Sequence, residues 1–176
     1  MGNYVKENAV RLSVIAVLAF VFFAGIPAFL SSPCVGTAFS HHFFHANILH
    51  LAVNCWSCWL VFRPQGRNAT PKILLAGYAI ATLAYLVAIP FLGRAPIGFS
   101  NILMAVCGLA VRNYAPGWWK SQWFMTVVAV NLIMLLTPAM AALTHLLSFS
   151  GGLAIGSISG MMKKNKKDYE RVAGNR

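Results

Sequence analysis

Long apolar segments separated by short polar connections are the feature that most restricts the fold of this chain. They lie at about residues 10–30, 45–62, 73–92, 99–114, 122–139 and 143–162. Segments near this length span a bilayer as α-helices, and they lack the alternation of apolar and polar residues found in membrane barrel strands. With 59% hydrophobic and 10% charged residues, the chain is more apolar than soluble domains. We predict an all-α polytopic membrane protein with a six-transmembrane-helix bundle.

The basic residues predict the orientation of these helices. Lys and Arg outnumber Asp and Glu by 14 to 3. All of them except Arg94 lie before the first segment or near its start, in the second and fourth connections, or in the C-terminal tail. Because Lys and Arg accumulate on the cytoplasmic side of membranes, both termini are predicted to be cytoplasmic (N-in, C-in). This pattern accounts for the positive charge, so we expect no nucleic-acid partner.

The chain divides into one membrane domain and a short tail. Residues 1–162 form the predicted membrane domain, and residues 163–176 form a basic cytoplasmic tail. Basic residues at a membrane surface are attracted to anionic lipid headgroups, so we expect the tail to lie against the bilayer. Together with the lack of an organellar presequence, the charge pattern favours a bacterial plasma (inner) membrane.

Acidic and cysteine residues exclude several kinds of chemistry. The three acidic residues, Glu7, Asp168 and Glu170, lie outside the apolar segments, which argues against carboxylate proton relays and acidic cation sites. Cys55 and Cys58 have the CxxC spacing, but they lie inside a segment and no second ligand pair follows. We interpret both cysteines as small buried packing residues.

The second apolar segment carries more polar side chains than helix packing requires. Successive helical residues turn by 100°, so Asn47, His50, Asn54 and Cys58 are predicted to share one face. In a bilayer such a face points into the helix bundle or toward a water-filled cavity. It serves either interhelical hydrogen bonding or an active site.

A metal-binding or transport protein is a third interpretation, based on His41, His42, His45 and His50. His41 and His45 stand one helical turn apart and could share a zinc ion. Because no acidic or thiolate residue completes the site, we expect neither a metal nor a cofactor.

Ser100 stands at the start of the fourth segment. It follows Pro96 and Gly98 and precedes an apolar helix. Serine is a favoured residue at helix N-caps. The same position suits a nucleophile, because the backbone N–H groups of a helix start can stabilise an oxyanion. Both interpretations are compatible with the sequence around Ser100.

The sixth segment combines a histidine with a row of small residues. At spacings of three and then four, one face carries His145, Ser148, Gly152, Gly156 and Gly160. Small residues every four positions let two helix backbones approach closely. In the predicted topology His145 and Ser100 both lie near the outer leaflet. His145 is therefore a candidate base for Ser100.

The polar residues of the second segment resemble those of the rhomboid family of intramembrane serine proteases. The second helix of that family carries His, four residues, His, three residues and Asn, a spacing matched here by His45, His50 and Asn54. His41 also stands at a position that is often His in bacterial members.

The fourth and sixth segments extend the resemblance. The GxSG motif that opens the family's fourth helix is matched in part by Gly98, Phe99 and Ser100. The family's sixth helix carries Ala-His followed by glycines, and here the matching residues are His145, Gly152, Gly156 and Gly160. The resemblance covers essentially the whole chain, including the six-helix order and the N-in topology.

This resemblance implies an intramembrane serine protease. Ser100 would be the catalytic nucleophile and His145 the general base. Its substrates would be transmembrane-helix segments of other membrane proteins, and no cofactor would take part.

The resemblance also implies which groups support the reaction. The oxyanion would be held by the backbone N–H groups of Ser100 and of Phe99, helped by side chains at the positions of His50 and Asn54. His45 would have a structural role or hold water near the site.

The chain differs from the family pattern close to the Ser–His pair. Asn101 stands in place of the second glycine of GxSG, Thr144 in place of alanine, Ser148 in place of the first following glycine, and Met104 in place of an aromatic residue. An alternative function is therefore a catalytically inactive rhomboid-like protein that binds client transmembrane helices.

Overall fold

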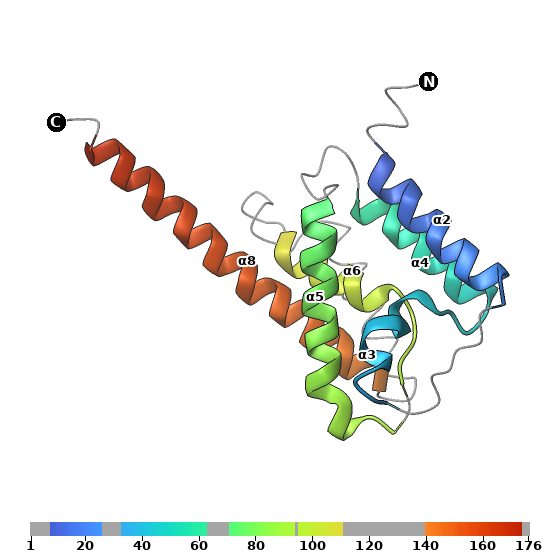
Figure 1. The fold of residues 1–176 in the computed structure, drawn as a ribbon. Coiled ribbons are helices and arrows are strands. Elements are labelled where there is room, and N and C mark those ends of the chain that lie inside the picture. Colours follow the sequence, from blue (N-terminus) through green and yellow to red (C-terminus); the bar gives the residue numbers. More distant parts are fainter. Residues whose placement is uncertain (1–7, 26–32, 63–70, 94, 111–139, 174–176) are drawn as a thin grey trace.

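The computed structural model describes residues 8–25, 33–62, 71–93, 95–110 and 140–173 (Figure 1). Within these ranges every regular element is a helix, in agreement with the predicted all-α class. In chain order they are α2 (Ala9–Phe23), α3 (Thr37–Ser40), η1 (His41–Phe43), α4 (Ile48–Val61), α5 (Pro71–Ala88), η3 (Ile89–Phe91), α6 (Ser100–Ala110) and α8 (Met140–Ala173). The predicted fifth span, 122–139, lies outside the described residues.

Among the described helices, α5 together with η3 matches the thickness of a bilayer best. Pro71–Phe91 forms a 21-residue apolar stretch that is long enough to cross a membrane. The other predicted spans are represented, in the described part of the chain, by shorter apolar helices: Ala9–Phe23, Ile48–Val61, Ser100–Ala110 and the Ala142–Ile158 part of α8.

Several helix boundaries differ from the predicted ones. The first predicted span, 10–30, ends as a helix at Phe23, where Ala24 forms the C-cap and Gly25 has a φ of +61°. The second predicted span, 45–62, becomes helical only at Ile48, because Asn47 has extended backbone angles and its side chain accepts a hydrogen bond from the His50 N–H at 2.8 Å. Asn47 is thus an exposed N-cap, and the prediction that it belongs to the polar face of the helix was wrong. The sixth span continues as helix beyond 162, to Ala173.

At the centre of the described helices lies α6. Residues 101–108 and Ala110 are all buried, because α6 packs against α8 and α5 and also contacts α4. In Figure 1, α8 crosses α5 at an angle and α2 lies beside α4, with α6 between the two groups. The side chains that follow Ser100 in the first turns of α6 are consequently surrounded by other helices.

Glycines bring α6 and α8 into backbone contact. A Cβ atom on Gly108 would meet the carbonyl oxygen of Phe149, and one on Gly152 would meet the carbonyl oxygen of Ala105. A Cβ on Gly156 would lie 2.9 Å from the carbonyl oxygen of Leu109. The packing of Gly160 lies outside the described side chains. Since later residues of α6 contact later residues of α8, the two helices run in the same direction and begin on the same side.

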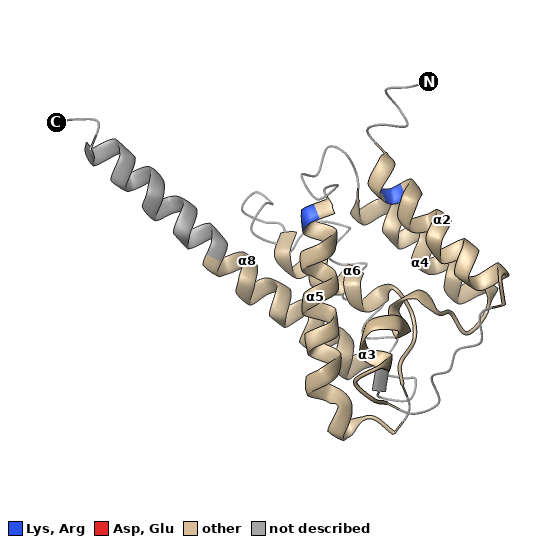
Figure 2. Cartoon of the chain, viewed as in Figure 1, with Lys and Arg blue, Asp and Glu red and all other residues tan. Residues whose placement is uncertain are grey.

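The buried face of α2 packs against α4. Arg11, Val14 and Leu18 are buried at spacings of three and four. The Arg11 guanidinium donates to the carbonyl oxygen of Trp59 at 3.2 Å and lies 3.6 Å above the centroid of its ring, a cation–π contact. Figure 2 shows basic residues in the first turns of α2 and α5, which lie at the same end of the molecule.

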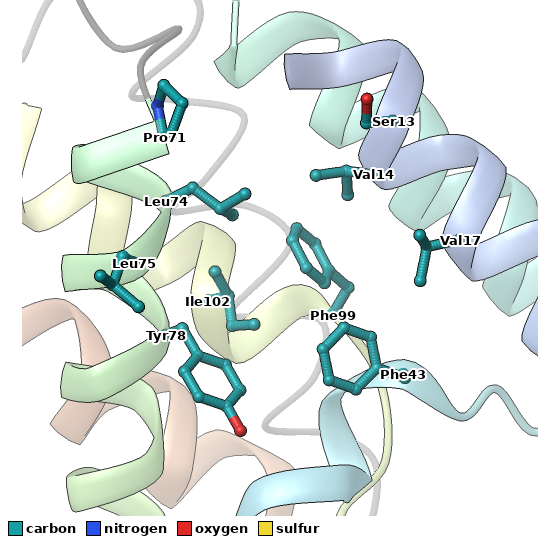
Figure 3. Close-up of a pocket in the computed structure, with 10 residues that line it drawn as sticks. All are labelled: Ser13, Val14, Val17, Phe43, Pro71, Leu74, Leu75, Tyr78, Phe99 and Ile102. Carbon is teal, nitrogen blue, oxygen red and sulfur yellow. The ribbon is translucent and has the colours of Figure 1, made fainter. Parts of the chain in front are cut away.

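An apolar groove of about 350 Å³ separates α2 from α5 (Figure 3). Its walls include Val14 and Val17 of α2, Leu74 of α5, and the ring of Phe99. Phe99 is only 2% exposed. Because the Phe99 ring packs in this groove, the position of the residue that immediately precedes α6 is fixed, and with it the start of that helix.

We predict that Gly152→Ala destabilises the protein by about 1–3 kcal/mol, the usual cost of overpacking, because its methyl group would meet the carbonyl oxygen of Ala105. Gly151→Ala is the matched control. Its Cβ would lie 3.0 Å from the Cγ2 methyl group of Ile80, a contact with a side chain rather than with a backbone atom. Both changes raise helix propensity equally, so the difference in unfolding temperature in detergent isolates the clash. Equal unfolding temperatures would contradict the backbone contact.

Candidate active site

Ser100 and His145 are in direct contact. The Oγ atom of Ser100 lies 2.7 Å from Nε2 of His145, and the imidazole is 3% exposed. When the hydroxyl donates in this hydrogen bond, Nε2 is unprotonated and the ring proton is on Nδ1. Nε2 is then placed to accept the hydroxyl proton as a general base.

The glycine contacts between α6 and α8 explain this proximity. Ser100 is the first residue of α6, and His145 lies near the start of α8. Because the helices run in the same direction and touch at Gly152 and Gly156, their first turns lie side by side. The crowding that Asn101 could introduce next to Ser100 does not separate the two reacting atoms.

The His50 imidazole lies against the turn that precedes Ser100. Gly98 has a φ of +126°, a backbone angle that residues with a Cβ atom rarely adopt. A Cβ there would stand 2.8 Å from Nε2 of His50 and 3.6 Å from Oγ of Ser100. His50 and Ser100 therefore both lie beside Gly98, and the imidazole packs so closely on it that only glycine fits there.

Hydrogen bonding indicates which nitrogen of His50 carries its proton. The backbone N–H of Ala46 donates to Nδ1 of His50 at 3.4 Å. In a neutral imidazole the other nitrogen, Nε2, is then protonated. Nε2 is the nitrogen beside Gly98, so the His50 side chain offers a hydrogen-bond donor next to Ser100.

The start of α6 supplies further donors. The carbonyl oxygen of Phe99 accepts the N–H groups of Ile102 and Leu103 at 3.0 and 3.2 Å, which marks it as the last residue before the helix. The first N–H groups of a helix have no acceptor within that helix. Because the Phe99 ring is held in the apolar groove, the backbone beside Ser100 has a defined position.

Two other predicted site residues lie near His50 without reaching Ser100 in the contacts described. Asn54 is buried, and its amide donates to the carbonyl oxygen of His50 at 2.9 Å, within its own helix. The ring of His45 lies edge-on to His50, with the centroids 5.1 Å apart. Both His45 nitrogens are buried, with no hydrogen-bond partner among the described residues. These residues surround His50 rather than the Ser–His pair.

A second polar cluster joins the segment before α4 to α5. Thr37 and Tyr85 share a hydrogen bond of 2.7 Å between their hydroxyl groups, and His42 lies 3.3 Å from the hydroxyl of Thr82. Burial lowers the pKa values of His41 and His42, so both rings are neutral at pH 7. Sequence analysis missed Thr82 and Tyr85, although they are polar residues three positions apart in an apolar helix.

The described residues give no support to the metal-site interpretation. No group of three His, Cys, Asp or Glu side chains in that part of the chain is arranged to hold a metal ion. Both ring nitrogens of His41 already have polar neighbours, the carbonyl oxygen of Thr37 and the amide of Asn101.

Comparison with models of protein families gives a match over most of the chain. The family model described as the Rhomboid domain matches residues 34–161. That range covers most of the chain and includes Ser100, His145 and His50. No curated protein matches the sequence.

We predict that Gly98→Ala slows the reaction of Ser100 with a fluorophosphonate, a probe of activated serines. The new methyl group would displace His50, and the backbone would be strained at a φ of +126°. Gly36→Ala is the control, because its Cβ would meet nothing closer than the Cys34 sulfur at 3.8 Å. Equal labelling of both variants would contradict the proposed packing of His50 on Gly98.

Proposed function

The chain belongs to the rhomboid family, and from this premise we propose that it is an intramembrane serine endopeptidase that cleaves transmembrane segments of other membrane proteins. Rhomboids are membrane proteins of the protease class. The observation that carries the proposal is the 2.7 Å contact between Ser100 Oγ and His145 Nε2. A serine hydroxyl within hydrogen-bond distance of an imidazole nitrogen that can accept its proton is the arrangement that nucleophilic catalysis requires.

In the proposed reaction Ser100 attacks the carbonyl carbon of the scissile peptide bond. His145 Nε2 accepts the hydroxyl proton and then donates it to the leaving amine, which leaves an acyl group on Ser100. Water releases this acyl group, with His145 again accepting and returning a proton. The chemistry needs two side chains, and neither a metal nor a cofactor is part of it.

The negative charge on the carbonyl oxygen is stabilised by donors beside Ser100. These are the backbone N–H groups of Ser100 and Phe99, at the positive end of the α6 dipole, and Nε2–H of His50. Donors that are already oriented before the reaction stabilise the developing charge without reorganisation. Asn54 supports this set through its hydrogen bond to the His50 carbonyl oxygen.

The protein is proposed to have six spans, with both termini in the cytoplasm. The shared direction of α6 and α8 supports it, because an odd number of spans, here the proposed fifth span, must lie between two helices that start on the same side. Basic residues at the starts of α2 and α5 lie at one end (Figure 2), which agrees with the positive-inside rule. We propose a bacterial plasma membrane as its location.

Substrate helices are proposed to enter laterally beside the fifth span, at residues 122–139. A peptide bond inside a helix is shielded by the surrounding backbone, so the segment must unwind locally to reach Ser100. Helix-destabilising residues near the cut should therefore favour cleavage.

We predict that Ser100→Ala abolishes labelling by a fluorophosphonate and cleavage of a reconstituted transmembrane substrate. His145→Ala should reduce both rates by about 10²–10⁴-fold, the usual contribution of a general base. Ser150→Ala, which changes an exposed serine of α8, is the control and should be labelled like the wild type. Labelling that persists in Ser100→Ala would place the reactive serine elsewhere.

We predict that His50→Ala lowers kcat by about 10²–10³-fold, as the loss of one oxyanion donor does in other serine proteases. KM should change little, because this donor acts mainly on the charge formed during the reaction. His50→Gln keeps an N–H donor and should recover part of the rate. A change confined to KM would instead indicate that His50 binds substrate.

The second candidate function is a catalytically inactive protein that binds client helices in the same cavity. Asn101 in place of a glycine is the residue that favours it. In that case the folded wild type is not labelled, and Ser100→Ala retains client helices in cells as well as the wild type does.

A further inference from the structure

One residue, His41, contacts the chain on both sides of Ser100. The backbone N–H of Gly98 donates to the His41 carbonyl oxygen at 3.0 Å. The side-chain amide of Asn101 lies 3.5 Å from Nε2 of the His41 ring. These contacts lie two residues before Ser100 and one residue after it. The turn that carries the serine is therefore bracketed by a single residue of η1.

The hydrogen bond at the other ring nitrogen assigns the direction of the Asn101 contact. Nδ1 of His41 lies 2.9 Å from the carbonyl oxygen of Thr37. A carbonyl only accepts, so Nδ1 carries the proton. In the neutral ring Nε2 has a free lone pair, and it accepts from the Asn101 amide.

His41 is itself held firmly on α5. Its ring stacks on Tyr85, with the centroids 4.1 Å apart and an angle of 27° between the planes. The Tyr85 hydroxyl bonds to the Thr37 hydroxyl at 2.7 Å, and the neighbouring ring of His42 contacts Thr82. His41, His42 and Tyr85 have no exposed surface. Through this cluster the long α5 helix restrains the short segment 37–43.

Space filling does not explain an asparagine at position 101. The side chain is 2% exposed, and its Oδ1 atom has no hydrogen-bond partner in the described part of the chain. Burying an amide is costly unless it forms hydrogen bonds, and leucine has the same number and branching of side-chain heavy atoms without a polar group. The amide contact with His41 is the one described interaction that distinguishes Asn101 from an apolar residue.

We propose that His41 and Asn101 are positioning residues that hold the Ser100 hydroxyl against His145. This inference rests on the proposed protease function. Gly98 provides an unusual backbone angle two residues before Ser100, so the first turn of α6 needs a support on each side to keep one orientation. The hydrogen bond from the Gly98 N–H to the His41 carbonyl oxygen supplies the support before Ser100. The contact between the Asn101 amide and the His41 ring supplies the support after it.

The test is a double-mutant cycle with Asn101→Leu, His41→Leu and the combined variant. We measure the rate of fluorophosphonate labelling and the kcat and KM for a reconstituted transmembrane substrate. Each single change should lower the labelling rate and kcat by about 10-fold, since small displacements of reacting atoms have large effects on rate. The combined variant should be no slower than the slower single variant, because both changes remove the same link.

Two further variants separate positioning from general damage. His41→Gln keeps an acceptor for the Asn101 amide and should recover part of the rate lost in His41→Leu. Cys107→Ala shortens another buried side chain of α6 and should leave the labelling rate unchanged. If Asn101→Leu does not fold, Asn101→Ala takes its place in the cycle.

Wild-type labelling rates in both single variants, or losses that multiply in the combined variant, would overturn the inference. A folded wild type that is not labelled instead contradicts the proposed function. In that case the unfolding temperatures of the same variants are compared. Decreases that add up in the combined variant overturn the link between His41 and Asn101, and decreases that do not add up support it.

Discussion

The contact between the Ala105 carbonyl oxygen and the backbone of Gly152 is the constraint on which the rest of the site depends. A side chain at position 152 would separate α6 from α8. With glycine there, the two backbones touch and the helices begin side by side. The Ser100 hydroxyl and the His145 imidazole then come within hydrogen-bond distance, although 45 residues separate them in sequence.

A second constraint is that buried polar groups need partners. The hydroxyl, imidazole and carbonyl groups of Thr37, His41 and Tyr85 satisfy one another in a compact cluster on α5. This cluster places segment 37–43 next to the start of α6. The polar residues before α4 therefore connect α5 to the turn that carries the serine.

Sequence patterns predicted the helical class, the face of α8 that carries small residues, and the two residues that meet across α6 and α8. They failed for Asn47, which caps α4 instead of lying on its polar face. Hydropathy marks which residues prefer lipid, but backbone hydrogen bonds decide where a helix begins. Residues 41–43 lie before the predicted second span and form a separate short helix.

The sequence by itself determined the number of apolar segments, the charge distribution and the spacing of glycines, because these follow from residue type and helical periodicity alone. The tertiary structure decided which polar groups are neighbours. The placement of His50 against Gly98, the bond from Asn54 back to its own helix, and the approach of Asn101 to His41 are contacts of a few ångströms. Such contacts depend on how helices from distant parts of the chain pack, and periodicity within one segment carries no information about that packing.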